Sequence, residues 1–150
     1  MSKYDERGGE VMPISLTAEV RTYAMSVAQV GERMRLTGNR FGEAGSKELA
    51  NLEEIKQLKV IYETLLGEFM SQKETLEKLK VPAQLIDEHN RLVENFSKYV
   101  TSTEIAIRAL NTNDFTVDEV THNNALKLQQ EASKGIVQVS NEIAVKLGLK

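Results

Sequence analysis

The stretch 52–79, LEEIKQLKVIYETLLGEFMSQKETLEKL, decides the fold that we expect for this chain. Apolar residues recur every seven positions in two columns of this stretch, and only Gln72 interrupts them. The columns are Ile55, Tyr62, Phe69, Leu76 and Leu58, Leu65, Gln72, Leu79. A seven-residue repeat keeps one apolar stripe facing its neighbours along a helix, so the pattern is typical of helical bundles. It predicts a helix that has Ser46 as its N-cap and runs to Lys80.

Three further segments repeat apolar residues at helical spacing. They run from about Leu16 to between Thr37 and Phe41, from about Pro82 to Leu110, and from a capping box of Thr116 and Glu119 to Leu147. Gly38 and the segment 42–45 carry helix-stop and loop signals, and 111–114 (NTND) is typical of a turn. Pro82 disfavours helical geometry at Val81. The alternative is one kinked helix that continues through Pro82.

The connections between these segments are short, and short links join antiparallel neighbours. We therefore expect an all-α protein, an elongated up-down-up-down antiparallel four-helix bundle. The bundle spans residues 15–150, and residues 1–14, which lack helical spacing, form a flexible N-terminal tail. Met12 follows Gly8-Gly9-Glu10, which a purine-rich, ribosome-binding-like stretch would encode. This makes Met12 a candidate for the native start, with an ordinary polar tail as the alternative.

The overall composition narrows the class of protein. The chain has 150 residues, of which 41% are hydrophobic and 27% charged, and this suits one soluble domain. Its net charge is −3 and both signs are interleaved, which argues against a nucleic-acid partner. No apolar run reaches the ~18 residues of a membrane span. The absence of cysteine and of an N-terminal apolar region predicts a cytoplasmic protein. The alternative is an extracytoplasmic surface, if the native gene carries a signal that is not present in this sequence.

Residues able to carry chemistry are few, since the chain has only two histidines and no cysteine. Glu119 and His122 have the Glu-x-x-His spacing of di-metal bundles, but those sites need a second such motif, which the chain lacks. We therefore predict no catalytic site, no metal and no cofactor, and a protein that is not an enzyme. His89, Gln72 and Thr103 are polar residues within apolar columns. They predict a ligand-binding or pH-sensitive position in the core. The alternatives are a hydrogen-bonded structural histidine at His89 and the fixing of helix register by Gln72 and Thr103.

Small residues form a further pattern. Ala24 and Gly31 share a column of the first helix, and Ala132 and Gly135 thin the middle of the last one. The first and last helices are neighbours in an up-down-up-down bundle, so we expect these four positions to let the two helices pack closely. The alternative is an exposed docking face for another protein or for a second copy.

A resemblance to a known family covers roughly residues 76–147. The residues that carry it are Leu79-Lys80-Val81-Pro82, followed by Leu85, His89, Leu92, Phe96 and Tyr99. They resemble a pattern in uncharacterised helical lipoproteins of Bacillus-type bacteria, in which a long helix ends in a Val-Pro turn and a helix with a histidine and an aromatic residue follows. The resemblance implies a four-helix bundle without known enzymatic activity. This sequence has neither the signal peptide nor the lipid-acceptor cysteine of that family.

Together these patterns predict a non-enzymatic bundle that acts as a protein–protein interaction module, with another protein or by self-association. The alternative is a sensor-like bundle that binds a small or apolar ligand between its helices. The interior separates the two hypotheses. An interaction module should have a filled core and an exposed apolar strip, whereas a ligand binder should contain a cavity of roughly a few hundred Å³.

Overall fold

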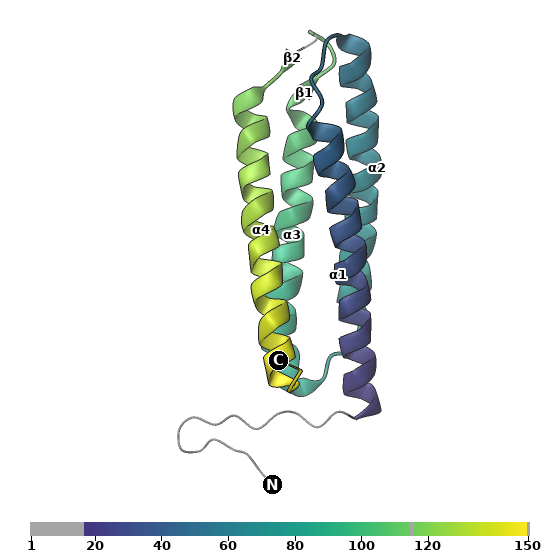
Figure 1. The fold of residues 1–150 in the computed structure, drawn as a ribbon, viewed down its shortest axis with the longest axis vertical. Coiled ribbons are helices and arrows are strands. Elements are labelled where there is room, and N and C mark those ends of the chain that lie inside the picture. Colours follow the sequence, from purple (N-terminus) through teal and green to yellow (C-terminus); the bar gives the residue numbers. More distant parts are fainter. Residues whose placement is uncertain (1–16, 115, 150) are drawn as a thin grey trace.

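The structure, a computed structural model, describes residues 17–114 and 116–149. Four long helices make up most of this part of the chain: α1 (Ala18–Gly45), α2 (Leu52–Glu77), α3 (Ile86–Arg108) and α4 (Glu119–Lys146). Figure 1 shows them side by side in a slender rod, with successive helices running in opposite directions. The expected all-α class with four helices is therefore confirmed. The tail at 1–14 and the candidate start at Met12 lie outside the described residues.

Contacts between distant parts of the chain agree with this arrangement. Lys80, just after α2, forms an ion pair of 3.2 Å with Glu19 in the first turn of α1. Lys146 at the end of α4 forms an ion pair of 2.9 Å with Glu88 in the first turn of α3. In both cases the end of one helix meets the beginning of another, as antiparallel neighbours require.

The boundary between α1 and α2 differs from the prediction. The helix α1 continues past Gly38, and Ser46 is its C-cap, whereas Asn51 is the N-cap of α2. A glycine in a helix costs roughly 1 kcal/mol. Continuation of α1, however, places Phe41 in the core, where it is 1% exposed and its ring stacks on that of Tyr62. Burial of such a side chain contributes roughly 1.5–3 kcal/mol, which outweighs the local preference of glycine for a helix end.

The connection between α2 and α3 separates two helices, so the alternative of one kinked helix is wrong. The helix α2 ends at Glu77, and Pro82 precedes a 3₁₀ turn, η1 (Ala83–Leu85), that leads into α3. The backbone N–H of Leu85 donates to the carbonyl of Pro82 at 2.9 Å. Proline has no N–H to donate, so it is well suited to a position just before a helical turn.

A short antiparallel pair of strands, β1 (Leu110–Asn111) and β2 (Thr116–Val117), links α3 to α4. Leu110, expected at the end of a helix, lies in β1, and Thr116, expected in a capping box, lies in β2, so both expectations are wrong. The N-cap of α4 is Asp118, whose carboxylate accepts a backbone N–H of the first turn at 3.1 Å. Aspartate is the stronger cap of the two residue types, which explains the shift. The turn predicted at 111–114 is confirmed, since the Asn111 side chain accepts backbone N–H groups within it.

One hydrophobic core runs through the bundle. The predicted columns of α2 face it, since all their members are buried except Leu79, which is partly buried. The largest fully buried side chains are Tyr23, Tyr62, Phe41, Phe69 and Phe96. The helices do not pack equally around the core. The main chains of α3 and α4 approach each other most closely, α2 packs on α1 and on α3, and α1 and α4 hardly approach each other.

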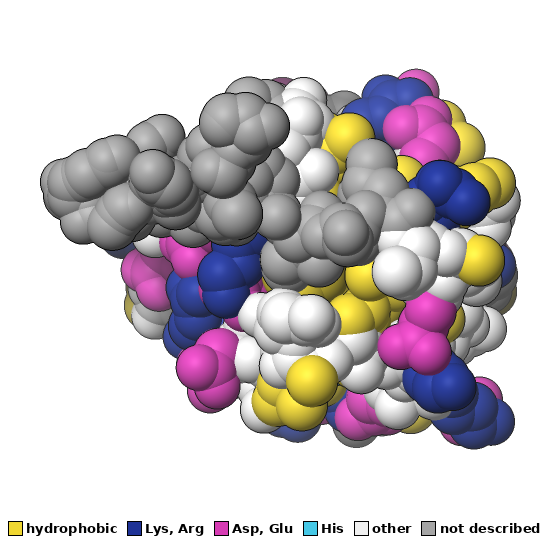
Figure 2. All heavy atoms as spheres, turned by 90° about the horizontal axis from the view of Figure 1, so that it is seen from below, with side chains coloured by type: hydrophobic (Ala, Val, Ile, Leu, Met, Phe, Trp, Pro, Cys, Tyr) yellow, Lys and Arg dark blue, Asp and Glu magenta, His cyan; other side chains and the backbone are white. Residues whose placement is uncertain are grey.

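The end of the bundle where α1 begins and α4 ends is viewed along the axis in Figure 2. Basic and acidic side chains both occur around its edge, and neither sign gathers into a patch. The charged side chains of the described residues in this view therefore do not form the single-sign surface that a nucleic-acid partner would need. Among the helices that the structure describes, none is long and apolar enough to cross a membrane.

Candidate functional site

The polar residues predicted for the core, His89, Gln72 and Thr103, are all buried, but the structure does not bring them into one site. His89 and Thr103 lie 14 residues apart in α3, which corresponds to about 21 Å along a helix. Gln72 lies on α2 and faces α1. Each residue therefore belongs to a different contact between helices.

His89 forms a buried pair with Tyr23 that joins α3 to α1. The Tyr23 hydroxyl and Nδ1 of His89 are 2.8 Å apart, and the two residues are 1% and 5% exposed. Burial lowers the pKa of His89, and the backbone of Leu76 offsets part of this effect. Burial, and then the charge of Glu88, raise the pKa of Tyr23. Both shifts favour the neutral forms of the two groups. The ring N–H of His89 donates to the backbone of Leu76, which leaves Nδ1 to accept a hydrogen bond from the tyrosine hydroxyl.

A second tyrosine–histidine pair joins α2 to α4, and the sequence analysis missed it. The Tyr62 hydroxyl and Nε2 of His122 are 3.0 Å apart, and the Tyr62 ring stacks on Phe41 with 4.1 Å between centroids. Burial raises the pKa of Tyr62 to about 12 and lowers the pKa of His122. His122 lies beside the apolar stripe of its helix. The available indication was Tyr62 itself, because a tyrosine in an apolar column needs a hydrogen-bond partner once it is buried.

Gln72 belongs to a polar link between α2 and α1. Its Nε2 donates to Oγ1 of Thr37 at 2.9 Å. The Thr37 hydroxyl also lies 3.0 Å from Glu68, which forms an ion pair with Arg40. Oε1 of Gln72 is buried without a partner among the described residues. Because that oxygen is closed off from solvent, the geometry favours a role in helix register over contact with a ligand.

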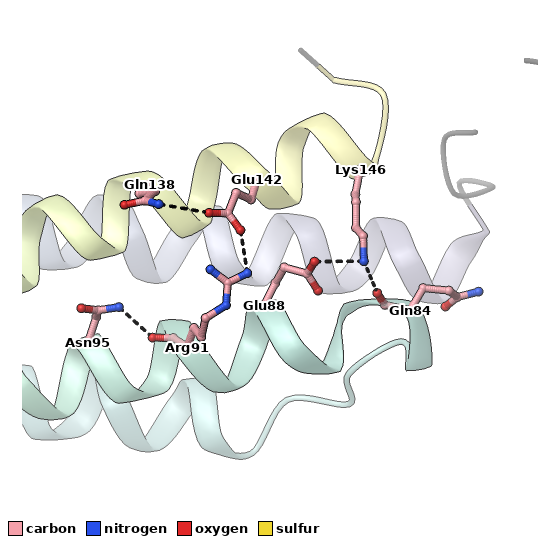
Figure 3. A network of polar contacts seen from close by, with 7 residues as sticks. All are labelled: Gln84, Glu88, Arg91, Asn95, Gln138, Glu142 and Lys146. Atoms are coloured by element: carbon pink, nitrogen blue, oxygen red, sulfur yellow. Dashed lines mark hydrogen bonds and ion pairs between the residues drawn. The ribbon is translucent and has the colours of Figure 1, made fainter. Parts of the chain in front are cut away.

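Figure 3 shows the interface between α3 and α4, where charged and polar side chains contact one another. Lys146 forms an ion pair with Glu88 at 2.9 Å and donates to the Gln84 carbonyl at 3.0 Å. Arg91 forms an ion pair with Glu142 at 2.6 Å. Burial by itself would raise the pKa of Glu88, but the hydrogen bond from Lys146 and the charges of Lys146 and Arg91 outweigh burial, so the pKa is lowered. These contacts hold the two helices together near the end of α4.

The small residues of α4 do not face α1 as predicted. A Cβ at Gly135 would overlap the side-chain amide of Asn95 in α3. That amide donates to the Arg91 carbonyl at 2.9 Å. Ala132 is fully enclosed in the core, at 0% exposed. The prediction of an α1–α4 contact at Gly135 is therefore wrong, because the closest neighbour of α4 is α3.

The seam between α1 and α4 is an open groove with a volume of about 420 Å³. Its edges and floor are formed by Gly31 and Gly38 of α1, by Ser133 and Ser140 of α4, and by the buried side chains Met34, Ile136 and Tyr99. A Cβ at Gly31 would find no atom within 4 Å. Ala24, in the same column of α1, is only partly buried. The expected close packing is therefore wrong at Gly31, since α4 is packed against α3 and does not reach it.

Tyr99 contributes a polar group to the floor of this α1–α4 groove. The residue is 7% exposed, and its ring lies against Phe69 with 4.7 Å between centroids. The hydroxyl lies 3.0 Å from the position that a Cβ of Gly38 would take. Within residues 17–114 and 116–149 it has no hydrogen-bond partner. Burial raises the pKa of Tyr99 to about 12, so at neutral pH the hydroxyl keeps its proton and can donate it to a bound molecule.

The arrangement offers chemistry for binding. In the described ranges no group of three or more His, Asp or Glu side chains lies together where it could hold a metal ion. His122, which shares the Glu-x-x-His spacing with Glu119, contacts Tyr62. The α1–α4 groove presents the core side chains Met34, Ile136 and Tyr99 to an incoming molecule. Other hollows lie beside Ile55 and Leu58 and along the α1–α2 interface.

Comparison with protein-family models, with curated proteins and with solved structures finds no match to this chain. The resemblance to helical lipoproteins of Bacillus-type bacteria therefore stays a prediction.

Proposed function

We propose that this protein is a non-enzymatic interaction module whose partner, another protein, binds along the α1–α4 groove. The observation that carries the proposal is that neighbouring helices do not approach each other equally closely. The main chains of the other three pairs of neighbouring helices approach closely, whereas α1 and α4 hardly approach each other and leave Met34, Ile136 and Tyr99 at the floor of an open groove. Val137 on its edge is 57% exposed. An apolar surface of this kind, bordered by polar residues, is typical of a site that another molecule covers.

The second candidate function is a sensor-like bundle that binds a small or apolar ligand between helices. The volume of about 420 Å³ and the unpartnered hydroxyl of Tyr99 favour it. Ligand pockets, however, usually bury most of the surface of their ligand, roughly 70–90%. The α1–α4 groove is open to solvent along one side and would leave more of a small molecule exposed. We therefore rank a protein partner first.

We propose that the protein is cytoplasmic, with an extracytoplasmic surface as the alternative if the native gene carries a signal that is not present in this sequence. Fractionation of the native host, followed by detection of the chain in each fraction, separates these two locations. The location in turn decides which extract is used in the binding experiment.

Capture of a partner from the native host tests the proposed function. The baits are the wild-type protein, the Gly31→Arg variant and the Gly67→Arg variant. Arginine at Gly31 would fill the α1–α4 groove, and arginine at Gly67 would project from α2. A Cβ meets no atom within 4 Å at either glycine, so both changes should leave the fold intact. Far-UV circular dichroism verifies this for each bait.

We expect a protein that the wild-type and Gly67→Arg baits capture and the Gly31→Arg bait does not. A set of captured proteins that is the same for all three baits contradicts the proposal. Binding of a small molecule to the wild-type protein, with no groove-dependent protein partner, would favour the sensor-like alternative.

A further inference from the structure

We infer that the partner presents an amphipathic α-helix, which lies lengthwise in the α1–α4 groove and offers one neutral acceptor side chain, Asn or Gln, to the Tyr99 hydroxyl. This inference rests on the proposed function and adds the kind of partner that the groove fits. It combines the shape of the groove with the unpartnered donor on its floor.

The edges of the α1–α4 groove have the repeat of a helix surface. Gly31 and Gly38 lie seven residues apart on α1, and Ser133 and Ser140 lie seven residues apart on α4. Seven residues are two helical turns, or about 10 Å along the axis, which is the distance between equivalent side chains of a packed helix. Small residues on both edges allow a third helix to approach to the usual interaxial distance of about 8–10 Å.

Contacts between α3 and α4 fix the level of the Tyr99 hydroxyl along the axis of the groove. Gln129 of α4 donates to Thr103 of α3 at 3.3 Å, which sets the relative height of these helices. Tyr99 lies one turn before Thr103, and Ser133 lies one turn after Gln129, so antiparallel α3 and α4 place them at the same level. Gly38 is at this level too, because the Tyr99 hydroxyl lies beside it. The acceptor of the partner should therefore meet the layer of Gly38, Tyr99 and Ser133.

The unpartnered hydroxyl defines the chemistry that it requires. Tyr99 is 93% buried, and its raised pKa, at about 12, leaves a neutral donor. A partner that covered it with an apolar side chain would leave a buried donor unpaired, at a cost of roughly 1–3 kcal/mol. A carboxylate would lose its hydration on the apolar floor, and Arg35, the cation that lines the groove, is already paired with Glu32. A neutral amide side chain satisfies the donor without bringing a charge.

A helix suits the α1–α4 groove better than an extended segment. An extended segment exposes backbone N–H and C=O groups along its whole length, and each of them needs a partner when it is buried. The floor offers chiefly the apolar side chains of Met34 and Ile136. A helix satisfies its own backbone groups and can bury an apolar face, as in known helix-in-groove complexes.

Charge contributes little to this recognition. Arg35, which also lines the α1–α4 groove, is held by Glu32 through hydrogen bonds of 3.1 and 2.6 Å. The pair neutralises itself at the surface. Binding should therefore depend on apolar contact and one hydrogen bond, and should change little with salt concentration.

Labelled peptides measured by fluorescence anisotropy test the inference. The probes are helical peptides roughly 20 residues long, about 30 Å, with leucines on one face and Gln at its centre. A matched peptide carries Met in place of that Gln, since Met has nearly the same shape without the amide. A third peptide has the same composition with its leucines spread around the helix. Each peptide is titrated with the wild-type protein and with the Tyr99→Phe, Gly31→Arg and Gly67→Arg variants.

We expect the Gln and Met peptides to bind the wild-type and Gly67→Arg proteins and not the Gly31→Arg protein. The affinity ratio of the Gln to the Met peptide should fall by about three- to tenfold in Tyr99→Phe, which loses only the donor. Equal ratios in the wild-type and Tyr99→Phe proteins overturn the inference. So does binding of the third peptide with equal affinity, or an absence of binding by all three.

Two outcomes separate this inference from the proposed function. A groove-dependent partner in the native host that contains no helical segment overturns the inference and leaves the proposed function standing. Sedimentation of the wild-type protein alone addresses a second copy as the occupant. A dimer that Gly31→Arg abolishes and Gly67→Arg keeps would assign the α1–α4 groove to self-association and would likewise overturn the inference.

Discussion

Alanine substitutions at three glycines test the unequal spacing of the helices most directly. Gly31, Gly67 and Gly135 all lie within helices, and none has a positive φ. Each change to alanine should therefore gain roughly 1 kcal/mol of helix stability. At Gly31 and Gly67 the added Cβ meets no atom within 4 Å, so nothing opposes this gain.

The same change at Gly135 should have the opposite sign. The added Cβ would overlap the amide of Asn95, which must move and lose its 2.9 Å hydrogen bond to the Arg91 carbonyl. The lost hydrogen bond costs about 1 kcal/mol and the overpacking about 1–3 kcal/mol. After subtraction of the helix gain of about 1 kcal/mol, Gly135→Ala should lower the free energy of unfolding by about 1–3 kcal/mol.

Urea unfolding followed by far-UV circular dichroism measures these differences. An unchanged m-value would show that each variant alters stability and not the extent of unfolding. In thermal melts the changes should appear as roughly 2–4 °C per kcal/mol for a chain of this size. The reasoning is refuted if Gly31→Ala destabilises the protein, because α4 would then lie against α1. It is equally refuted if Gly135→Ala stabilises the protein as much as Gly67→Ala does.

Four further results are expected. Tyr23→Phe should lower the free energy of unfolding by about 1–2 kcal/mol, because Nδ1 of buried His89 loses its donor, and a neutral effect in urea melts would contradict this. Burial lowers the pKa of His89 and His122 below 6.5 in the folded chain, so the unfolded chain binds protons first as the pH falls. Stability should therefore decrease as the pH drops below 6.5. Urea midpoints that stay constant or increase as the pH is lowered would contradict this prediction. Gln72→Met removes both a hydrogen bond and an unpartnered oxygen, so its urea midpoint should correspond to a change within about 1 kcal/mol, and a larger loss would show that Oε1 has a partner. Elemental analysis of the purified protein should find no stoichiometric iron, manganese or zinc, and one metal per chain would overturn our interpretation of the two histidines.

The element boundaries show where local patterns mislead. Serine at position 46 is a residue type that favours an N-cap, and glycine at position 38 is one that favours a helix end. The helix α1 nevertheless runs through Gly38 and ends beside Ser46. The burial of Phe41 between them exceeds the local preferences in energy. The N-caps that form are Asn51 and Asp118, and the sequence analysis named neither of them.

In the candidate site, the sequence patterns failed to predict contacts between different helices. The apolar columns indicated that Tyr62 would be buried, and it is, but they carried no information about His122, its partner across the bundle. The column of Ala24 and Gly31 was visible in the sequence, but the close packing expected of it is wrong at Gly31, which lies on an open groove. Spacing along a helix gives the direction in which a residue points, and leaves open whether a neighbour fills that direction.

The sequence alone determined that this protein has four helices around one apolar core, because a seven-residue repeat of apolar residues can be buried only by helices that pack side by side. It also determined the shortage of reactive residues. Only the tertiary structure decided which seam would stay open. Ion pairs such as Lys146 with Glu88, and the fit of Gly135 against Asn95, draw α4 onto α3 and away from α1. That choice depends on contacts between residues distant in the chain, and it leaves Tyr99 at the floor of the groove in which we expect the partner to bind.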